Sequence, residues 1–305
     1  MLQATDLKKS FGTRAAVAGV SFDVPHGETF GLLGPNGAGK TTTIHMLAGI
    51  LRPDAGTISI DGQLDPTRSA VRERLGVAPQ SLSLYEELSA EDNLAFFGRC
   101  YPMSAQRLKE RVVWALEFAG LSDRRLDKVK TFSGGMKRRL NLVCSLIHDP
   151  PVVFLDEPTV GVDPQSRNHL LENIETLARQ GRTILYTTHY MEEAERLCTR
   201  VAIIEQGKIL ALDTVAGLID KYGGQAVVEA EIASGTSDSW RTVLDKVLGN
   251  GQYQLDANRL RFHADQPLPQ ANRVADAGLR LDTVRIHRPD LEAVFLKLTG
   301  RRLCD

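Results

Sequence analysis

Short apolar segments alternate along the first two thirds of the chain with segments of helical periodicity. Residues 29–33 and 152–155 are continuously apolar, which is typical of strands buried on both faces in a parallel sheet. The segment 41–48 follows the first of them with helical spacing and stops at Gly49, a residue that commonly ends helices. This alternation predicts an α/β fold built on a parallel sheet.

Three further stretches depart from that alternation. Residues 2–24 turn like an antiparallel β-layer, and residues 89–146 have the period of a helical insertion. The stretch Tyr222-Gly223-Gly224 marks a boundary, so we expect one domain over 1–222 and a small α+β domain over 225–305. The second domain has the order strand, helix, two strands, helix, strand, which is the ferredoxin-like arrangement, with one helix appended.

A glycine-rich loop joins the strand at 29–33 to the next helix. Its sequence, Gly34-Pro35-Asn36-Gly37-Ala38-Gly39-Lys40-Thr41-Thr42, fits the phosphate-binding pattern G-x-x-x-x-G-K-[ST]. Glycines let successive backbone N–H groups face an anion, and the helix N-terminus adds the positive end of its dipole. We expect Lys40 to reach the β- and γ-phosphates of ATP and the Thr41 hydroxyl to bind Mg²⁺. A chance glycine-rich turn is the alternative, but the flanking strand and helix favour nucleotide binding.

Polar side chains follow three of the predicted strands. Gln80 comes after 75–78, Asp156 and Glu157 end the strand at 152, and His189 follows 183–188. Ligands of α/β sheets bind at the carboxyl ends of the strands. We therefore expect Asp156 to hold Mg²⁺ through water, Glu157 to face the attacking water, and His189 to contact the γ-phosphate. The Gln80 amide oxygen would bind Mg²⁺ or hold that water. Each residue alone is also explained as an ordinary turn or structural residue.

Two more places carry candidate ligand contacts. Phe11 lies in an exposed segment, where its ring could stack on adenine, although a lone phenylalanine is more often a core residue. Ser133-Gly134-Gly135 stands at a predicted helix N-terminus, and the Ser133 hydroxyl and Gly135 N–H would form a second anion site. An ordinary capped helix explains this stretch equally well. Asp163 follows Glu157 on a turn.

The charge, the cysteines and the apolar content of the chain bear on its partners and its cellular compartment. The net charge of the 305-residue chain is −1, and acidic residues interleave with the basic run from Arg124 to Arg139, which predicts a solvated helical face. The four cysteines form no C-x-x-C pair, which favours reduced thiols in a cytosolic protein. Residues 1–9 lack the apolar region of a secretory leader, and no apolar run approaches the length of a membrane span. A role in a membrane process would therefore need another chain.

Taken together, residues 2 to about 220 resemble the nucleotide-binding subunit of an ABC transporter. The chain departs from the usual motifs at Phe132 and Met136, on either side of Ser133-Gly134-Gly135, and at Val162, just before Asp163. Neither of the first two changes removes a phosphate donor. By position, the resemblance identifies Phe11 as the adenine-stacking residue, 34–42 as the Walker A loop, Gln80 as the Q-loop, Ser133-Gly134-Gly135 as the signature, 152–156 as Walker B, Glu157 as the catalytic glutamate, Asp163 as the D-loop and His189 as the switch histidine.

Residues 83–89 and 288–300 are similar to a narrower group, the ATPases of ABC-2-type exporters of the daunorubicin-resistance and nodulation-factor export types. This resemblance implies an ATPase on the inner face of the cytoplasmic membrane that powers export through a separate ABC-2-type permease. A permease helix would enter a groove near Gln80 and Tyr85. A second ATPase subunit, in a homodimer, would close its signature over the bound ATP. Mg²⁺ and Lys40 would then neutralise phosphate charge, with His189 and Ser133 at the γ-phosphate.

Two other functions compete with this interpretation. Soluble ABC proteins that act on ribosomes or nucleic acid carry two cassettes or a long coiled-coil insertion, and the sequence shows neither, so we expect no nucleic-acid partner. The other alternative is a regulatory protein that holds ATP without turnover, and the intact set Lys40, Asp156, Glu157 and His189 argues against it. The sequence does not indicate the transported substrate.

Overall fold

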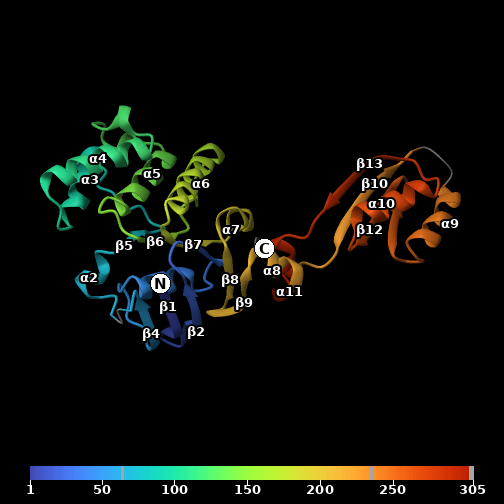
Figure 1. The fold of residues 1–305 in the computed structure, drawn as a ribbon, viewed down its shortest axis with the longest axis horizontal. Coiled ribbons are helices and arrows are strands. Elements are labelled where there is room, and N and C mark those ends of the chain that lie inside the picture. Colours follow the sequence, from blue (N-terminus) through green and yellow to red (C-terminus); the bar gives the residue numbers. More distant parts are fainter. Residues whose placement is uncertain (63–64, 234–236, 302–305) are drawn as a thin grey trace. The chain divides into compact units, whose positions relative to one another are not determined.

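The computed structural model describes residues 1–62, 65–233 and 237–301, and the chain separates into two units, Met1–Val215 and the part from Ala216 onward. Figure 1 shows both units as a ribbon, and each is described by itself below. Within the described ranges, no helix has both the length and the apolar character needed to cross a bilayer. Cys100, Cys144 and Cys198 are free thiols, whereas Cys304 lies outside the described residues.

A six-stranded sheet forms the centre of the first unit. The two continuous apolar runs of the sequence become β3 and β6, and the strand predicted at 183–188 becomes β7; all three are buried along their whole length. Their parallel pairing places the carboxyl ends of the strands at one edge of the sheet, as the sequence predicts. The order is β5 (Leu75–Ala78), β6 (Val152–Asp156), β7 (Thr183–Thr188), β3 (Thr29–Leu33) and β8 (Arg200–Glu205), all parallel, with β9 (Lys208–Thr214) antiparallel at the edge.

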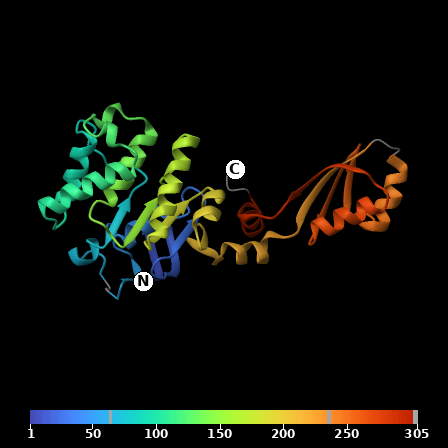
Figure 2. The ribbon, with the colours of Figure 1, turned by 45° about the horizontal axis from the view of Figure 1, so that its top comes forward.

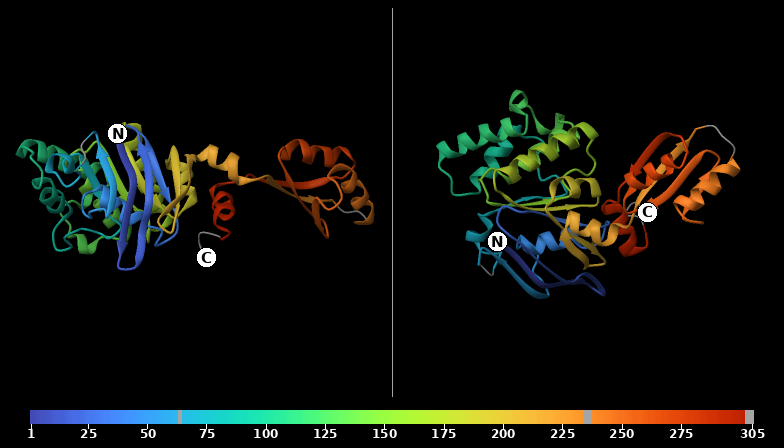
Figure 3. Two further views of the ribbon diagram at one scale, coloured as in Figure 1. Left: turned by 90° about the horizontal axis from the view of Figure 1, so that it is seen from below. Right: turned by 45° about the vertical axis from the view of Figure 1, so that its right-hand side comes forward.

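An antiparallel layer covers the first helix. It has the order β2 (Arg14–Val24), β1 (Leu2–Phe11), β4 (Ala55–Ile60), and β1 and β2 are the long paired strands of Figure 3. Side chains of this layer share one hydrophobic core with β3 and α1 (Lys40–Leu47). The sequence predicts short strands at 15–17 and 20–24, whereas the structure has one strand, β2, over Arg14–Val24.

The predicted helical insertion has its own core. It contains α3 (Ala90–Arg99), α4 (Ala105–Phe118) and α5 (Gly134–Ser145), which lie together in Figure 1. Leu94, Leu116 and Leu140 are fully or almost fully buried in a cluster separate from that of the sheet. Short 3-10 turns at Ser122–Arg124 and Val129–Thr131 join α4 to α5, while α2 (Ser69–Arg72) precedes β5, and α6 (Pro164–Arg179) and α7 (Met191–Leu197) follow β6 and β7.

The basic run within this insertion is largely paired. Arg124 forms an ion pair with Asp127, Lys128 and Lys130 with Glu87, and Lys137 with Glu86. The guanidinium groups of the last two arginines donate to backbone carbonyls instead. The basic side chains of this run thus bind mostly to other residues of the same chain.

The second unit contains the ferredoxin-like arrangement. Its sheet order, β11-β12-β10-β13, is antiparallel throughout, and α9 and α10 contribute to one core against it (Figure 2). The unit begins before the glycines at 222–224 because the π-helical turn Ile219–Gly223 packs on α11. Its elements are α8 (Val215–Leu218), β10 (Ala226–Ile232), α9 (Ser237–Val247), β11 (Tyr253–Asp256), β12 (Arg259–Ala264), α10 (Pro267–Asp276), β13 (Leu281–His287) and α11 (Leu291–Thr299).

Candidate functional site

The loop between β3 and α1 depends on glycine at two places. A Cβ atom on Gly34 would lie 2.1 Å from the Ile204 carbonyl oxygen, and one on Gly39 would lie 2.4 Å from the Ala16 carbonyl oxygen. Gly39 also has φ of 107°, a left-handed value that favours glycine, directly before the first residue of α1. The loop is thereby held close to the backbone of neighbouring strands, with the N-terminus of α1 beside a cavity.

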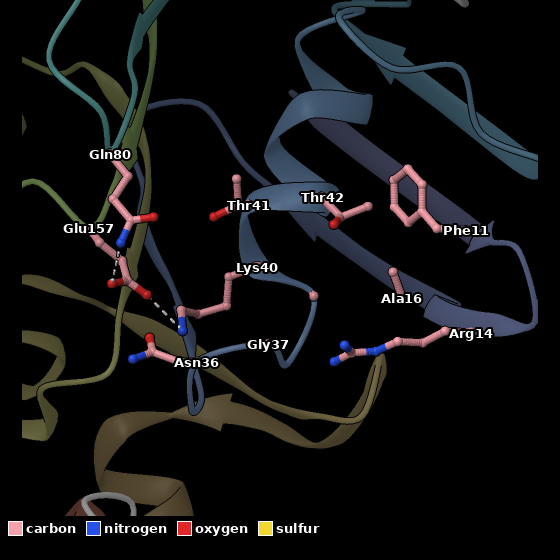
Figure 4. A pocket seen from close by; sticks show the side chains of 11 residues that line it. Phe11, Arg14, Ala16, Asn36, Gly37, Lys40, Thr41, Thr42, Gln80 and Glu157 are labelled. Atoms are coloured by element: carbon pink, nitrogen blue, oxygen red, sulfur yellow. Dashed lines mark hydrogen bonds and ion pairs between the residues drawn. The ribbon is translucent and has the colours of Figure 1, made fainter.

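That cavity has a volume of about 460 Å³, within the usual range for small-molecule sites. Figure 4 shows Phe11 and Arg14 at one end, Gln80 and Glu157 at the other, and the loop between them. The Phe11 ring is 55% exposed, so its face is available to a ligand. The lining residues are Phe11, Arg14, Ala16, Asn36, Gly37, Gly39, Lys40, Thr41, Thr42, Gln80 and Glu157.

Lys40 lies among oxygen acceptors at the base of this cavity. Its side chain is 3% exposed, and its Nζ lies 2.8 Å from Glu157 Oε1. The same ammonium donates to the Gly34 carbonyl at 2.7 Å and to the Pro35 carbonyl at 3.0 Å. The Pro35 carbonyl also accepts from the N–H of buried Ala38 at 3.2 Å, and neither of these two residues is among those that line the cavity. A buried cation held only by oxygen atoms is well placed to attract a phosphate.

Glu157, directly after β6, contacts residues that follow two other strands, β5 and β7. Its Oε2 accepts from Gln80 Nε2 at 3.3 Å and lies 3.2 Å from His189 Nδ1. Glu157 has φ of 45°, a left-handed conformation that costs a residue with a side chain about 1–3 kcal/mol. Its N–H donates to Thr187 Oγ1 at 3.0 Å, which holds this backbone in place. The structure thus brings together Gln80, Glu157 and His189, as the sequence predicts, although His189 does not itself line the cavity.

Asp156 carries a buried oxygen that lacks a partner. The residue is 1% exposed, and its Oδ1 accepts from Thr187 Oγ1 at 2.7 Å, whereas Oδ2 has no hydrogen bond within the part of the chain that the structure describes. An unsatisfied buried carboxylate oxygen is costly, so this atom suits a hydrated cation. The described residues contain no group of three or more His, Cys, Asp or Glu that could hold a metal. Mg²⁺ would therefore need further oxygen ligands, from Thr41, Gln80 or the nucleotide.

The remaining candidates lie away from this cavity. Ser133 caps α5, accepting from the Met136 N–H at 3.2 Å, and Asp163 caps α6, accepting from the Ser166 N–H at 3.0 Å. The hydrogen bonds from Ser166 lower the pKa of Asp163. A Cβ on Gly135 would lie 3.4 Å from Asp163 Oδ2, so the two caps adjoin each other. Within one chain, the structure does not bring them to the loop.

Some residues of the site escape sequence reasoning. Arg14 pairs with Phe11 across the first hairpin and so reaches the same end of the cavity. Arg138 donates to the Gln80 carbonyl and, at 3.2 Å, to the Val160 carbonyl, which ties α5 to two loops of the site. The turn at 12–13 was a signal for Arg14, because hairpin partners face each other. Nothing local in the sequence distinguishes Arg138 from its basic neighbours.

A loop of this kind between a buried strand and a helix, with acidic and polar residues at the neighbouring strand ends, defines a nucleoside triphosphatase of the P-loop class. Residues 17–160 match the family model described as ABC transporter. The chain belongs to the ATP-binding subunits of ABC transporters, and it is an ATPase.

Relatives support this at full length. The chain is 40% identical to the linearmycin resistance ATP-binding protein of Bacillus subtilis, over 100% of both chains. It is 44% identical to the Nod factor export ATP-binding protein I of Burkholderia lata, over 98% of this chain and 97% of that protein. A solved structure described as the ATP-binding subunit of an ABC transporter is 32% identical, with a TM-score of 0.66 over 73% of this chain and 93% of that chain. A dimeric ATP-binding cassette bound to ADP and Pi shares the fold, at 22% identity and a TM-score of 0.64 over 70% of this chain and 98% of that chain.

Proposed function

We propose that this chain hydrolyses ATP to power export of a substrate across the cytoplasmic membrane through a separate ABC-2-type permease. The observation that carries the proposal is the cavity, which has an aromatic ring at one end and the buried Lys40–Glu157 pair at the other. Relatives over nearly the full length are named for export and for drug resistance. Location on the inner face of that membrane belongs to the same proposal.

Each candidate residue has a distinct task in this reaction. Adenine stacks on Phe11, and the triphosphate follows the loop 34–42 to Lys40. Lys40 then exchanges its ion pair with the Glu157 carboxylate for one with the phosphates. The Glu157 carboxylate thereby becomes free to accept the proton of the attacking water. Gln80 and His189 both contact the Oε2 atom of that carboxylate and so help to hold it in place. Thr41, Gln80 and Asp156 would hold Mg²⁺, which would supply further neutralisation of phosphate charge.

A second copy of the chain is expected to complete the site. Gly134 is exposed, its φ is not left-handed, and a Cβ added there would meet no atom of the described residues within 4 Å. Its lack of a side chain therefore has no explanation in the packing of this chain. A close approach by the γ-phosphate of a partner's ATP would explain it, with the Ser133 hydroxyl and Gly135 N–H as donors and Asp163 nearby.

The permease would dock beside the same loops. A groove of about 510 Å³ lies between the end of α1, β5 and the helical insertion. It includes exposed Ile50, and Gln80 at the end of β5 is separated from groove residue Ser83 by only a short segment. Movement of Gln80 with the nucleotide would thus be transmitted to a helix seated in the groove. The groove is lined by Ala48, Gly49, Ile50, Arg72, Leu75, Val77, Pro79, Ser83, Phe97, Tyr101, Asn141, Cys144 and Ser145.

A matched pair of surface substitutions tests this function. Ile50 and Leu126 are 65% and 69% exposed, but only Ile50 lines the groove. The tagged chain, Ile50→Glu and Leu126→Glu are each used to capture partners from solubilised membranes, followed by mass spectrometry. We expect a polytopic membrane protein with the unmodified chain and with Leu126→Glu, and its loss with Ile50→Glu at unchanged ATP turnover. Capture of ribosomal proteins or nucleic acid, without a membrane protein, would favour the soluble ABC ATPase.

Under this proposal the two domains have different roles. Residues 1–222 would bind and hydrolyse ATP, and residues 225–305 would form an accessory domain. Relatives of equal length support a role for the accessory domain within this group of exporters, because the similarity extends over the whole chain.

A further inference from the structure

A buried carboxylate behind the site is not used by the mechanism above. Glu193, in α7, is 1% exposed and accepts four hydrogen bonds from side chains. Its Oε1 accepts from Thr159 Oγ1 and Arg167 Nε, both at 2.7 Å. Its Oε2 accepts from the Tyr186 hydroxyl at 2.8 Å and from Thr188 Oγ1 at 2.7 Å. A charge this deeply buried persists only when it is paired and hydrogen-bonded, as it is here.

Two of the donors come from the segments next to Glu157 and His189. Thr159 lies in the segment that leaves Glu157, and Thr188 directly precedes His189. Each of these two threonines binds a different oxygen of Glu193. A single carboxylate therefore spans the two segments whose ends place His189 Nδ1 3.2 Å from Glu157 Oε2.

The residue after the histidine is tied to the same centre. Thr188 Oγ1, which donates to Glu193, also accepts from the Tyr190 N–H at 2.9 Å. The Arg167 guanidinium, also bonded to Glu193, lies 4.3 Å from the centroid of the Tyr190 ring. That ring lies 4.2 Å from the ring of His189. Backbone and ring contacts on both sides of His189 thus lead to one carboxylate.

The four donors cannot readily exchange this partner for another. Burial, together with the charge of Glu193, raises the pKa of the Tyr186 hydroxyl well above its usual value, so the hydroxyl keeps the proton it donates. Oε2 accepts from Tyr186 and Thr188, both in β7, whereas Oε1 accepts from Thr159, between β6 and α6, and from Arg167 in α6. Replacing either oxygen by an NH₂ group would set donors against donors.

We infer that Glu193 is a positioning residue for ATP hydrolysis, which holds the His189 segment and the segment after Glu157 at the separation that hydrolysis requires. This inference rests on the proposed function. A purely structural carboxylate would stabilise the fold without affecting turnover by the folded protein. A positioning role predicts that the geometry of His189 and Glu157, and hence kcat, depends on Glu193 even where the protein is fully folded.

The test compares Glu193→Gln with Glu192→Gln in the full chain. Glu192 lies in the same helix but is exposed, so it is the matched control. At a temperature well below the unfolding midpoint of each variant, we expect Glu193→Gln to lower kcat about tenfold, with KM for ATP changed less than about twofold. We expect no change in either quantity for Glu192→Gln. A normal kcat in folded Glu193→Gln would overturn the inference.

A second readout does not depend on turnover. The imidazole resonances of His189, assigned by their loss in His189→Gln, are recorded by NMR in protein without nucleotide. We expect them to shift or broaden in Glu193→Gln and to stay unchanged in Glu192→Gln; unchanged signals in both would overturn the inference. If Glu193→Gln does not fold, Thr159→Val, which removes one donor, replaces it with the same expectations. An unmodified chain without ATP turnover would refute the proposed function alone, because the NMR comparison still tests Glu193.

Discussion

Two adjacent glycines provide a sharp test of the dimeric site. Gly134 and Gly135 begin α5, yet their surroundings differ: a Cβ on Gly134 would meet none of the described atoms within 4 Å, whereas a Cβ on Gly135 would lie 2.4 Å from the Cβ of Ser166. The same small change, glycine to alanine, is thus harmless to this chain's own packing at the first position and forbidden at the second. We therefore expect Gly134→Ala to keep its stability but lose activity, and Gly135→Ala to lose stability.

The magnitudes follow from these contacts. In Gly134→Ala, a residue with better helix propensity enters an open position, so we expect unfolding stability to be unchanged or raised by up to about 1 kcal/mol. In Gly135→Ala, the methyl group overlaps Ser166, and relief of such overpacking costs about 1–3 kcal/mol. If a phosphate of the partner's ATP approaches Gly134, the new methyl group should nevertheless lower kcat by at least about tenfold, which corresponds to 1.4 kcal/mol in the transition state.

Two assays on the purified chain decide the matter. Urea unfolding measures stability, and steady-state ATP turnover over a range of protein concentrations measures activity that depends on dimer formation. Gly134→Ala should retain stability but lose turnover at every concentration. Full turnover in a stable Gly134→Ala protein would refute the reasoning, because nothing would then approach this residue closely during hydrolysis.

Four further substitutions test the site and the fold. Glu157→Gln should still bind ATP and form a dimer on size-exclusion chromatography, while kcat falls about 10²–10⁴-fold because the general base is lost; a monomer with saturating ATP would contradict the shared site. Lys40→Ala should weaken ATP binding at least about tenfold in a fluorescence titration, since phosphate loses its buried cation; equal affinity would place the phosphates elsewhere. Phe11→Ala should raise KM for ATP about fivefold or more at unchanged stability, because only a stacking face is lost; an unchanged KM would remove adenine from this end. Burial raises the pKa of Asp149, but the Arg182 hydrogen bond and neighbouring guanidinium charges lower it more, so the net pKa is depressed. Its contribution is therefore present above the unfolded pKa and lost as pH falls through the folded one, so Asp149→Asn should cost about 1 kcal/mol in urea unfolding at pH 7 and progressively less as the pH falls below about 4. A pH-independent cost would contradict this account.

Much of the fold was predictable because its signals are local. The apolar runs that became β3 and β6 are buried on both faces, so their composition alone indicates central strands. The ferredoxin-like order of the second unit follows from the succession of elements, and the strand order confirms it. The candidate residues at the strand ends could also be named, because parallel strands bring their carboxyl ends to one edge whatever the loops between them do.

Other features required the folded chain. The sequence does not indicate that Arg138 bonds to Gln80 or that Glu193 bonds to Thr159, because each pair is far apart along the chain. The different surroundings of Gly134 and Gly135 are likewise invisible in a pair of identical letters. The class of fold, the phosphate loop and the polar residues at the strand ends could be predicted, since these depend on local composition and period. The side chains that hold those residues in place could not, because such contacts depend on distances between elements that the chain order does not specify.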